Sequence, residues 1–544
     1  MSTSKPSPDA GLLTEAKRIA QQFDLKPDDI ARATDHCLRQ LQNGLEQPGA
    51  TQIPSFVTRV PNGSEKGIFL AVDLGGTHCR VCSVNLHGDS TYRLIQVKHV
   101  IPRPLKVNPS HKPLFAFVAD KIADFLHQNP EADVESVEGK TVQRDDFRRL
   151  GFTFSFTYES HSLSSGTMLQ WDKGWDIADA LGKDPCEMLQ TAIDDLELPV
   201  LVSAMTSDSV GTLMARAYTS PWSSTTLVGA VFGTGTNAAY VERLESVRKL
   251  HSHDGFRNRR PGDLMVMNTE WGAWIDDDHT VVPMTPYDVQ LDQASANPNR
   301  QILEKLTSGM YLGELARLAA LDLYKAKLFD MAVDDDSSLY MEEDVDSSFL
   351  SLIAEDENGS LEEARRHISD ILGAQNVSVN DALALRHIST AIVRRAAHLA
   401  GSATAAIVLQ SGRLEAMDAA GKGTESICRE QEVTGTPSFW SRTPSTIWTF
   451  VRRALKYVFC CFGANDADSE CSSGKNPQWI DGCDSIDIGI EGSLFEFHPT
   501  FEKEMRRAFQ HIPGIGLNGE KRIKIGLAKD GSSLGAALVA QSVQ

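Results

Sequence analysis

Apolar residues recur along the chain with two different periods, and the changes of period delimit the expected elements. Over residues 11–45 the apolar positions follow a helical spacing, which returns over residues 300–410. Short apolar runs, such as residues 68–72, have the length of buried strands. A stretch rich in Pro, Gly and Asn, residues 47–66, is expected to be a linker. Because strand and helix signals alternate, the pattern predicts an α/β fold class.

Two segments of the chain combine an apolar strand, a glycine turn and a second strand. Residues 68–86 contain a Gly-Gly-Thr turn, and residues 226–241 contain a Gly-Thr-Gly turn. This repeated design predicts a duplicated core, with one hairpin in each of two lobes. We expect the small lobe at residues 66–206 and the large lobe at residues 207–544. The helices and linker of residues 1–65 are expected to pack on the large lobe.

The composition narrows the class of function. The chain has 544 residues and a formal net charge of −20, so it is long enough for two lobes, and its charge would repel nucleic acid. The polar N-terminus lacks a secretory hydrophobic region, and we expect the nine cysteines to be reduced in a cytoplasmic or nuclear location. No Cys/His spacing matches a zinc site. Small-molecule chemistry is therefore expected, without direct nucleic-acid binding.

Both glycine turns have the chemistry of a phosphate site. Such a turn leaves backbone N–H groups and a hydroxyl free, and Asp73, just before the first turn, could hold magnesium through water. The alternative is a tight turn without a ligand. A third turn, Gly492-Ser493 between strand-like flanks, could lie under the base or ribose of a nucleotide. Two phosphate turns from two lobes would clamp a triphosphate.

Asp208 is the candidate general base, and it begins a predicted helix. The helix N-terminus would keep its carboxylate ionised, ready to accept a hydroxyl proton. The alternative interpretation is an ordinary N-cap. Four further polar residues fit either a sugar site or ordinary surface, capping and turn positions: Lys173, Asn237, Glu270 and Glu304.

Taken together, these segments resemble the hexokinase family, in order, over about residues 12–410 and 483–541. The alternative is an actin- or chaperone-like ATPase, which would share the two phosphate hairpins but would lack the segments that match the family's sugar site. The matching segments are LAVDLGGTHCRV, LGFTFSF, WDKGW, SDSVGTL, FGTGTNAAY, MNTEWGAW, QILEKLTSGMYLGEL, IGIEGSLFEFHPTF and KDGSSLGAALVA.

The resemblance implies a two-lobed fold of the actin-like ATPase and RNase H-like type. It implies transfer of the ATP γ-phosphoryl group to the 6-hydroxyl of a hexose, glucose above all, with Asp208 as base and Mg²⁺ held by Asp73 through water. The residues it implies for sugar binding are Ser155, Asp172, Lys173, Ser207, Asn237, Glu270 and Glu304. Those it implies for ATP are Asp73, Gly75, Gly76, Thr77, Arg80, Gly233, Thr234, Gly235, Gly492 and Ser493.

Two residues depart from the family pattern inside this site. Ser207 stands where the family has Asn, and losing that hydrogen-bond partner would cost roughly 1–3 kcal/mol. Asp172 stands where the family has Thr and adds a carboxylate beside the triphosphate. These changes favour a hexose- and ATP-binding regulator of the carbon-source response with weak or lost phosphorylation, similar to the atypical hexokinases of filamentous fungi. The alternative is an active glycolytic hexokinase, because Asp208 and Lys173 are retained.

A low-complexity insert at about residues 411–482 interrupts the family pattern. Within it, residues 447–463 would form a helix with aromatic and basic side chains, which suits a membrane interface, and Cys460 and Cys461 could be palmitoylated. The alternative is a helix that docks on this protein or on a partner. Peripheral association with an intracellular membrane, such as the mitochondrial outer membrane, is therefore one expectation for an otherwise cytoplasmic protein.

Overall fold

The computed structural model describes residues 8–130, 147–171, 174–221, 225–251, 256, 260, 262–418 and 485–543. The chain divides into two units, Met1–Leu414 with Cys483–Gln544 and Glu415–Gly482, and the elements described below belong to the first. The predicted interface segment 447–463, with Cys460 and Cys461, lies outside the described residues.

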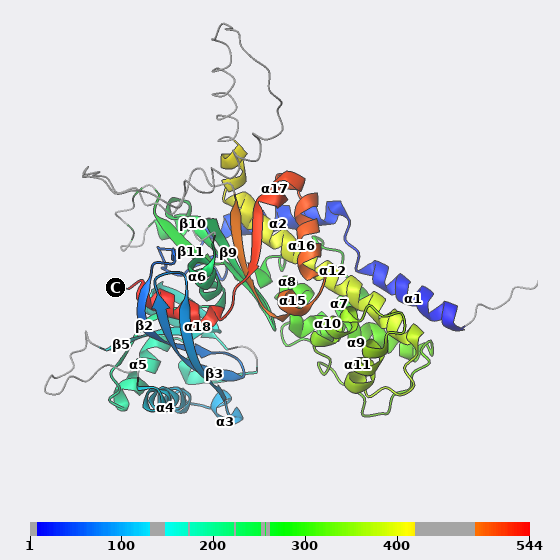
Figure 1. Ribbon diagram of the computed structural model, residues 1–544, viewed down its shortest axis with the longest axis horizontal. Helices are drawn as coiled ribbons and strands as arrows, with labels where there is room; N and C mark the ends of the chain where they lie inside the picture. The colour runs from blue at the N-terminus through cyan, green and yellow to red at the C-terminus, as the bar shows by residue number, and fades with distance from the viewer. Residues whose placement is uncertain are drawn as a thin grey trace, which may run out of the picture. The chain divides into compact units, whose positions relative to one another are not determined.

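A five-stranded mixed sheet contains the first glycine turn. Its central strand is buried on both faces, which explains the unbroken apolar run in the sequence. One face packs against α4 (Lys112–Gln128) and α5 (Pro185–Asp195), and the other against α18 (Gly531–Gln541) (Figure 1). The strand order is β4 (Tyr92–Val100), β3 (His78–His87), β2 (Lys66–Leu74), β5 (Arg148–Phe154) and β8 (Val200–Thr206).

A six-stranded mixed sheet contains the second glycine turn. Three of its strands form an antiparallel meander and two more run parallel to β9, as β5 and β8 run parallel to β2 in the other sheet. The two sheets thus share one topology, as the repeated strand–turn–strand design predicts. The order is β1 (Ile53–Pro54), β11 (Leu264–Asn268), β10 (Thr236–Arg243), β9 (Thr226–Phe232), β12 (Ile486–Glu491) and β13 (Ile523–Leu527).

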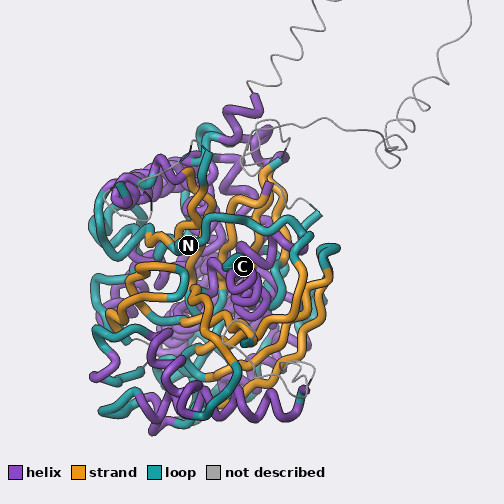
Figure 2. Tube along the Cα trace, turned by 90° about the vertical axis from the view of Figure 1, so that its left-hand side faces the viewer, coloured by secondary structure: helices purple, strands orange, loops and turns teal. Residues whose placement is uncertain are grey.

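The long helix α12 (Val379–Gln410) organises the helices around the six-stranded sheet. It packs against α1 (Pro8–Gln22), α2 (Pro27–Glu46) and α16 (Phe501–His511), and helices flank the strands in Figure 2. By length and composition α12 could cross a membrane, but 89% of its apolar window is buried inside the protein, as in a core helix.

The other α-helices and the small β6–β7 sheet have the following bounds: α3 (Arg103–Lys106), α6 (Asp208–Thr219), α7 (Pro286–Ala294), α8 (Ile302–Thr307), α9 (Gly309–Lys325), α10 (Ser348–Glu355), α11 (Glu362–Leu372), α15 (Ser493–Phe497), α17 (Gly516–Arg522), β6 (Thr157–Ser162) and β7 (Ser165–Gln170).

The third glycine turn differs from the prediction. It was expected between two strands, but β12 precedes it and the short helix α15 follows it, with Ser493 as first helical residue. The reason lies in the burial pattern after the turn. Leu494 and His498 are buried while Glu496 and Phe497 are exposed, and a spacing of four is helical rather than alternating.

Candidate functional site

Asp73 is the last polar residue of β2 before the first turn. Its side chain is buried, and its Oδ2 accepts a hydrogen bond of 2.5 Å from Arg80 Nη1 on the paired strand β3. Antiparallel pairing sets Arg80 directly opposite Asp73, so the ion pair follows from the register of the hairpin. The two residues predicted to serve magnesium and ATP thus lie together at the base of the turn.

The first turn is closed by local bonds and held by one distant side chain and by the N–H of Ile101, which donates to the carbonyl of Thr77 at 3.0 Å. The Gly75 N–H donates to the carbonyl of His78 at 3.1 Å, and Thr77 Oγ1 lies 2.8 Å from His78 Nδ1. The indole N–H of Trp175 donates to the carbonyl of Gly76 at 2.9 Å. Since Trp175 follows the predicted sugar-loop residues in sequence, this bond ties the sugar loop to the phosphate turn.

The second turn lies between β9 and β10 and is held by backbone groups. The Gly233 N–H donates to the carbonyl of Gly235 at 3.0 Å. The first N–H groups of α9, those of Gly309 and Met310, donate to the carbonyls of Gly233 and Thr234 at 2.8 and 3.1 Å. The start of α9 therefore fixes the shape of this turn.

The third turn packs directly on the second. Gly492 has a φ of +122°, and a Cβ placed there would lie 2.2 Å from the carbonyl oxygen of Phe232. Only glycine fits this approach, because both the backbone conformation and the contact exclude a side chain. Exposed Ser493 therefore lies at the N-terminus of α15, next to the second phosphate turn.

Asp208 is the first residue of α6, but it is not the N-cap. The cap is Ser207, whose hydroxyl accepts a hydrogen bond of 3.4 Å from the N–H of Val210, so the capping interpretation of Asp208 is wrong. Serine is among the strongest N-caps, which explains the shift by one residue. Asp208 Oδ1 accepts from the N–H of Ser209 at 2.7 Å, so this carboxylate lies at the positive end of the helix.

A chain of hydrogen bonds joins this helix to the predicted sugar residues. The hydroxyls of Ser207 and Ser209 lie 3.0 Å apart, and Ser209 donates to Asn268 Oδ1 at 3.2 Å. Asn237 Nδ2 donates to Asn268 Oδ1 and to Glu270 Oε1, each at 2.9 Å. Asn268 Nδ2 also donates to Glu270 Oε1, at 2.8 Å. Five residues from the start of α6, from β10 and from the end of β11 therefore converge, and Asn268 is a member that the sequence did not single out.

Glu304 approaches the same region from α8. Its Oε1 lies 3.4 Å from the N–H of Thr236, the first residue after the second turn. A Cβ on Gly235 would lie 2.7 Å from this oxygen, so the glycine makes room for the carboxylate. The predicted sugar residue Glu304 is thus also a neighbour of the predicted phosphate turn.

The remaining sugar candidates lie on the side of the five-stranded sheet. Half-buried Ser155 follows β5, and its N–H donates at 3.3 Å to the last carbonyl of β2, beside the first turn. Asp172 and Lys173 lie outside the described residues. Tyr158, which the sequence did not suggest, has a raised pKa, mainly through burial and further through carboxylates that include Glu270.

Glu491, at the end of β12, is a site residue that sequence reasoning missed. Burial, and then the nearby carboxylates of Asp208, Asp73 and Asp530, raise its pKa to about 7. The hydroxyl of Thr212 lies 2.9 Å from the backbone carbonyl of Asp208 and 3.1 Å from Glu491 Oε2. The available signal was an acid directly before a glycine turn, similar to Asp73, which lies two residues before Gly75.

The chain is similar to known proteins along nearly its whole length. Family models described as Hexokinase match residues 15–218 and 227–542. A glucokinase of Aspergillus niger is 39% identical over 98% of this chain and 97% of its own, and glucokinase-1 of Saccharomyces cerevisiae is 30% identical over 96% of each. The structure of a Schistosoma mansoni hexokinase complexed with glucose has a TM-score of 0.72 at 28% identity, over 98% of this chain and 99% of its own. The predicted two-lobed, actin-like α/β fold is confirmed.

Proposed function

The chain belongs to the hexokinase family, and on that premise we propose that it is an active ATP:D-hexose 6-phosphotransferase with glucose as its principal substrate. The observation that carries this proposal is the position of Asp208. Its carboxylate lies at the N-terminus of α6, on a helix bonded through Ser209 and Asn268 to Glu270 and Asn237. A base and a set of hydroxyl-binding groups held by one network suit proton removal from a bound sugar.

In this mechanism the protein's own groups position the sugar and accept one proton. Glu270 and Glu304 accept hydrogen bonds from sugar hydroxyls. Asn237, whose two Nδ2 protons go to Asn268 and Glu270 in the free protein, turns one of them to a sugar hydroxyl when the sugar binds. Asp208 takes the proton of the 6-hydroxyl as its oxygen bonds to the γ-phosphorus, while the bond from that phosphorus to the bridging oxygen breaks and ADP leaves. The positive end of helix α6 lies beside this carboxylate.

The nucleotide is proposed to lie across the glycine turns. Free backbone N–H groups and the hydroxyls of Thr77 and Thr234 would face the phosphates, and Ser493 would lie near the nucleoside. Mg²⁺ usually takes one or two carboxylates with phosphate and water ligands, and the buried carboxylate of Asp73 fits that pattern. When bound, the ion would neutralise charge on the phosphates; Arg80 fixes the orientation of the Asp73 carboxylate.

The departures from the family pattern are compatible with turnover. Ser207 caps α6 and so keeps Asp208 in place. Compared with the Asn of the family pattern, Ser207 loses one hydrogen bond to the sugar, which lowers the sugar affinity by roughly 1–3 kcal/mol. We therefore favour the active enzyme over the hexose-sensing regulator that the sequence first suggested. Asp172 and the 411–482 insert keep the regulator as second candidate, and a protein that binds glucose and ATP without turnover would favour it.

The proposed location is the cytoplasm, and the proposed partners are hexose and Mg–ATP. Membrane or protein binding through residues 447–463 stays a prediction. It is tested by replacing Cys460 and Cys461 with serine and fractionating cells. An unchanged soluble distribution of both forms would exclude palmitoyl anchoring.

The function is tested by glucose- and fructose-dependent ADP formation with Mg–ATP. We expect turnover in the usual enzyme range of about 1–10³ s⁻¹, with a loss of about 10²–10⁴-fold in Asp208→Asn, which keeps the size of the side chain but cannot accept the proton. Equal rates for the two proteins would contradict the assignment of Asp208. A rate that does not depend on sugar would point to a simple ATPase.

A further inference from the structure

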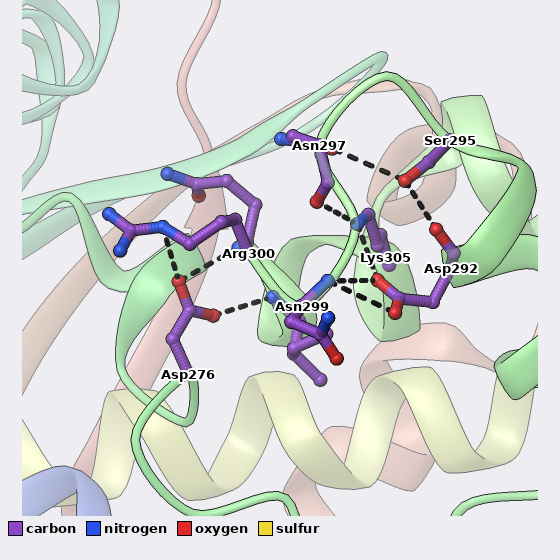
Figure 3. Close-up of polar contacts among 9 residues, drawn as sticks. Asp276, Asp292, Ser295, Asn297, Asn299, Arg300 and Lys305 are labelled. Carbon is purple, nitrogen blue, oxygen red and sulfur yellow. Dashed lines mark hydrogen bonds and ion pairs between the residues drawn. The ribbon is translucent and has the colours of Figure 1, made fainter.

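The short helix α8, which carries Glu304, is held at its start by an acidic side chain. Asp276 accepts the N–H of Gln301 through Oδ2 and the N–H of Ile302 through Oδ1, each at 2.9 Å (Figure 3). Arg300 Nε lies 3.7 Å from the same carboxylate. A helix of six residues has few hydrogen bonds of its own, so its direction depends on such external partners.

A buried ion pair holds one side of helix α8 in place. Lys305 Nζ donates to Asp292 Oδ1 at 2.7 Å and to the carbonyl of Asn297 at 2.8 Å (Figure 3). Asp292 also accepts the N–H of Asn299, at 3.0 and 3.1 Å. The side chains of Lys305 and Asp292 are 3% and 11% exposed. Removing either partner would leave a buried charge uncompensated, so the pair locks the loop before α8 onto the helix.

The far end of α8 leads directly into the second phosphate turn. The N–H of Ser308 donates to the carbonyl of Glu304 at 2.8 Å, and the next two N–H groups hold the carbonyls of Gly233 and Thr234. Successive helical residues point about 100° apart. Lys305 can therefore anchor one side of the helix while Glu304 faces the turn.

We propose that Lys305 and Asp292 are positioning residues that set the affinities for sugar and for nucleotide together. They hold α8 so that Glu304 meets the sugar while the end of the same helix shapes the second phosphate turn. The inference rests on the proposed function for the identity of the two ligands. It adds that one ion pair, itself outside contact with either ligand, governs both.

The test compares Lys305→Met with a matched control, Arg317→Met. Arg317 forms an ion pair with Glu314 on α9 whose side chains are 3% and 10% exposed, so the control breaks an equally buried pair. The affinities of the full-length proteins for glucose and for Mg–ATP are measured by calorimetry, beside KM, kcat and the thermal midpoint. Lys305→Arg serves as the conservative variant.

We expect Lys305→Met to weaken both affinities by about tenfold or more and Lys305→Arg to restore most of each. Arg317→Met should lose similar thermal stability but keep both affinities within about twofold. If Lys305→Met does not fold, Asp292→Asn, which keeps the side-chain size, carries the same comparison. Equal effects of Lys305→Met and Arg317→Met, or a loss confined to one ligand, would overturn the proposal.

These measurements separate this proposal from the proposed function. Wild-type protein that binds glucose and ATP but does not turn over would refute the proposed activity, while the binding comparison would still decide the role of Lys305. Wild-type protein that binds neither ligand would overturn both.

Discussion

The two predicted phosphate turns are held by the segments that carry the sugar residues, but by different means. In the five-stranded sheet, the carbonyl of Gly76 accepts one bond from the indole of Trp175, which follows the sugar loop. In the six-stranded sheet, the carbonyls of Gly233 and Thr234 accept two backbone bonds from the segment after Glu304. Each half therefore links a sugar segment to a phosphate turn.

The difference lies in how firmly each link is made. The first turn receives one backbone bond, from the Ile101 N–H to the carbonyl of Thr77 at 3.0 Å, and one side-chain bond, from Trp175. A single side-chain hydrogen bond is worth about 0.5–1.5 kcal/mol, so the link to the sugar loop is weak and can respond to its occupancy. The second turn is held by two backbone bonds, the close contact at Gly492 and the buried Lys305–Asp292 pair. We infer a rigid turn in one half and an adjustable turn in the other.

The largest effect is expected from Gly492→Ala, in the rigid half. Its Cβ would meet the carbonyl of Phe232 at 2.2 Å in a backbone conformation that disfavours alanine, so unfolding free energy should fall by about 3 kcal/mol or more. The control is Gly75→Ala in the first turn, where the nearest atom is 3.7 Å away and φ is not positive. Urea unfolding compares them, and equal losses would refute the difference in rigidity.

An intermediate, pH-dependent effect is expected from Glu491→Gln. The pKa of Glu491 is raised to about 7, so between about pH 4.5 and 7 the folded protein binds more protons there than the unfolded chain does. Wild-type stability should therefore fall relative to the variant as pH rises through this window. Without nucleotide or Mg²⁺, the variant should be about 1–3 kcal/mol more stable at pH 8 and nearly equal at pH 4.5. A difference that is the same at both pH values would contradict the raised pKa.

The smallest effect is expected from Trp175→Phe, in the adjustable half. The ring keeps its place among the aromatic residues, but the bond to Gly76 is lost, so Mg–ATP affinity should fall roughly fivefold. Trp171→Phe is the control, because its indole donates to Ile177 at 2.9 Å in the same cluster, away from the turn. Titration calorimetry with Mg–ATP should separate the two variants, and identical losses would show that packing alone matters.

Local signals in the sequence predicted both hairpins and the start of α6, because apolar runs and glycine turns act over a few residues. The same local patterns gave a wrong prediction where the surroundings of a side chain in the folded protein decide the structure. It placed a strand after Gly492, where helical burial produces α15, and it assigned the cap to Asp208 where Ser207 takes it.

The long-range contacts within each half could not be predicted from the sequence. Trp175 meets Gly76 and Glu491 meets Thr212 only after the chain has folded, across long stretches of sequence. A buried lysine such as Lys305 also gives no local signal, since lysine is usually exposed.

The most direct test of coupled sugar and nucleotide sites is the affinity of Asp208→Asn protein for Mg–ATP, measured by calorimetry with and without saturating glucose. This variant should bind both ligands while turning them over about 10²–10⁴-fold more slowly than the wild type. If the sugar segments hold the phosphate turns, glucose should tighten Mg–ATP binding by about tenfold, within the usual range for coupled sites. Mg–ATP affinity that is unchanged by glucose would contradict the coupling.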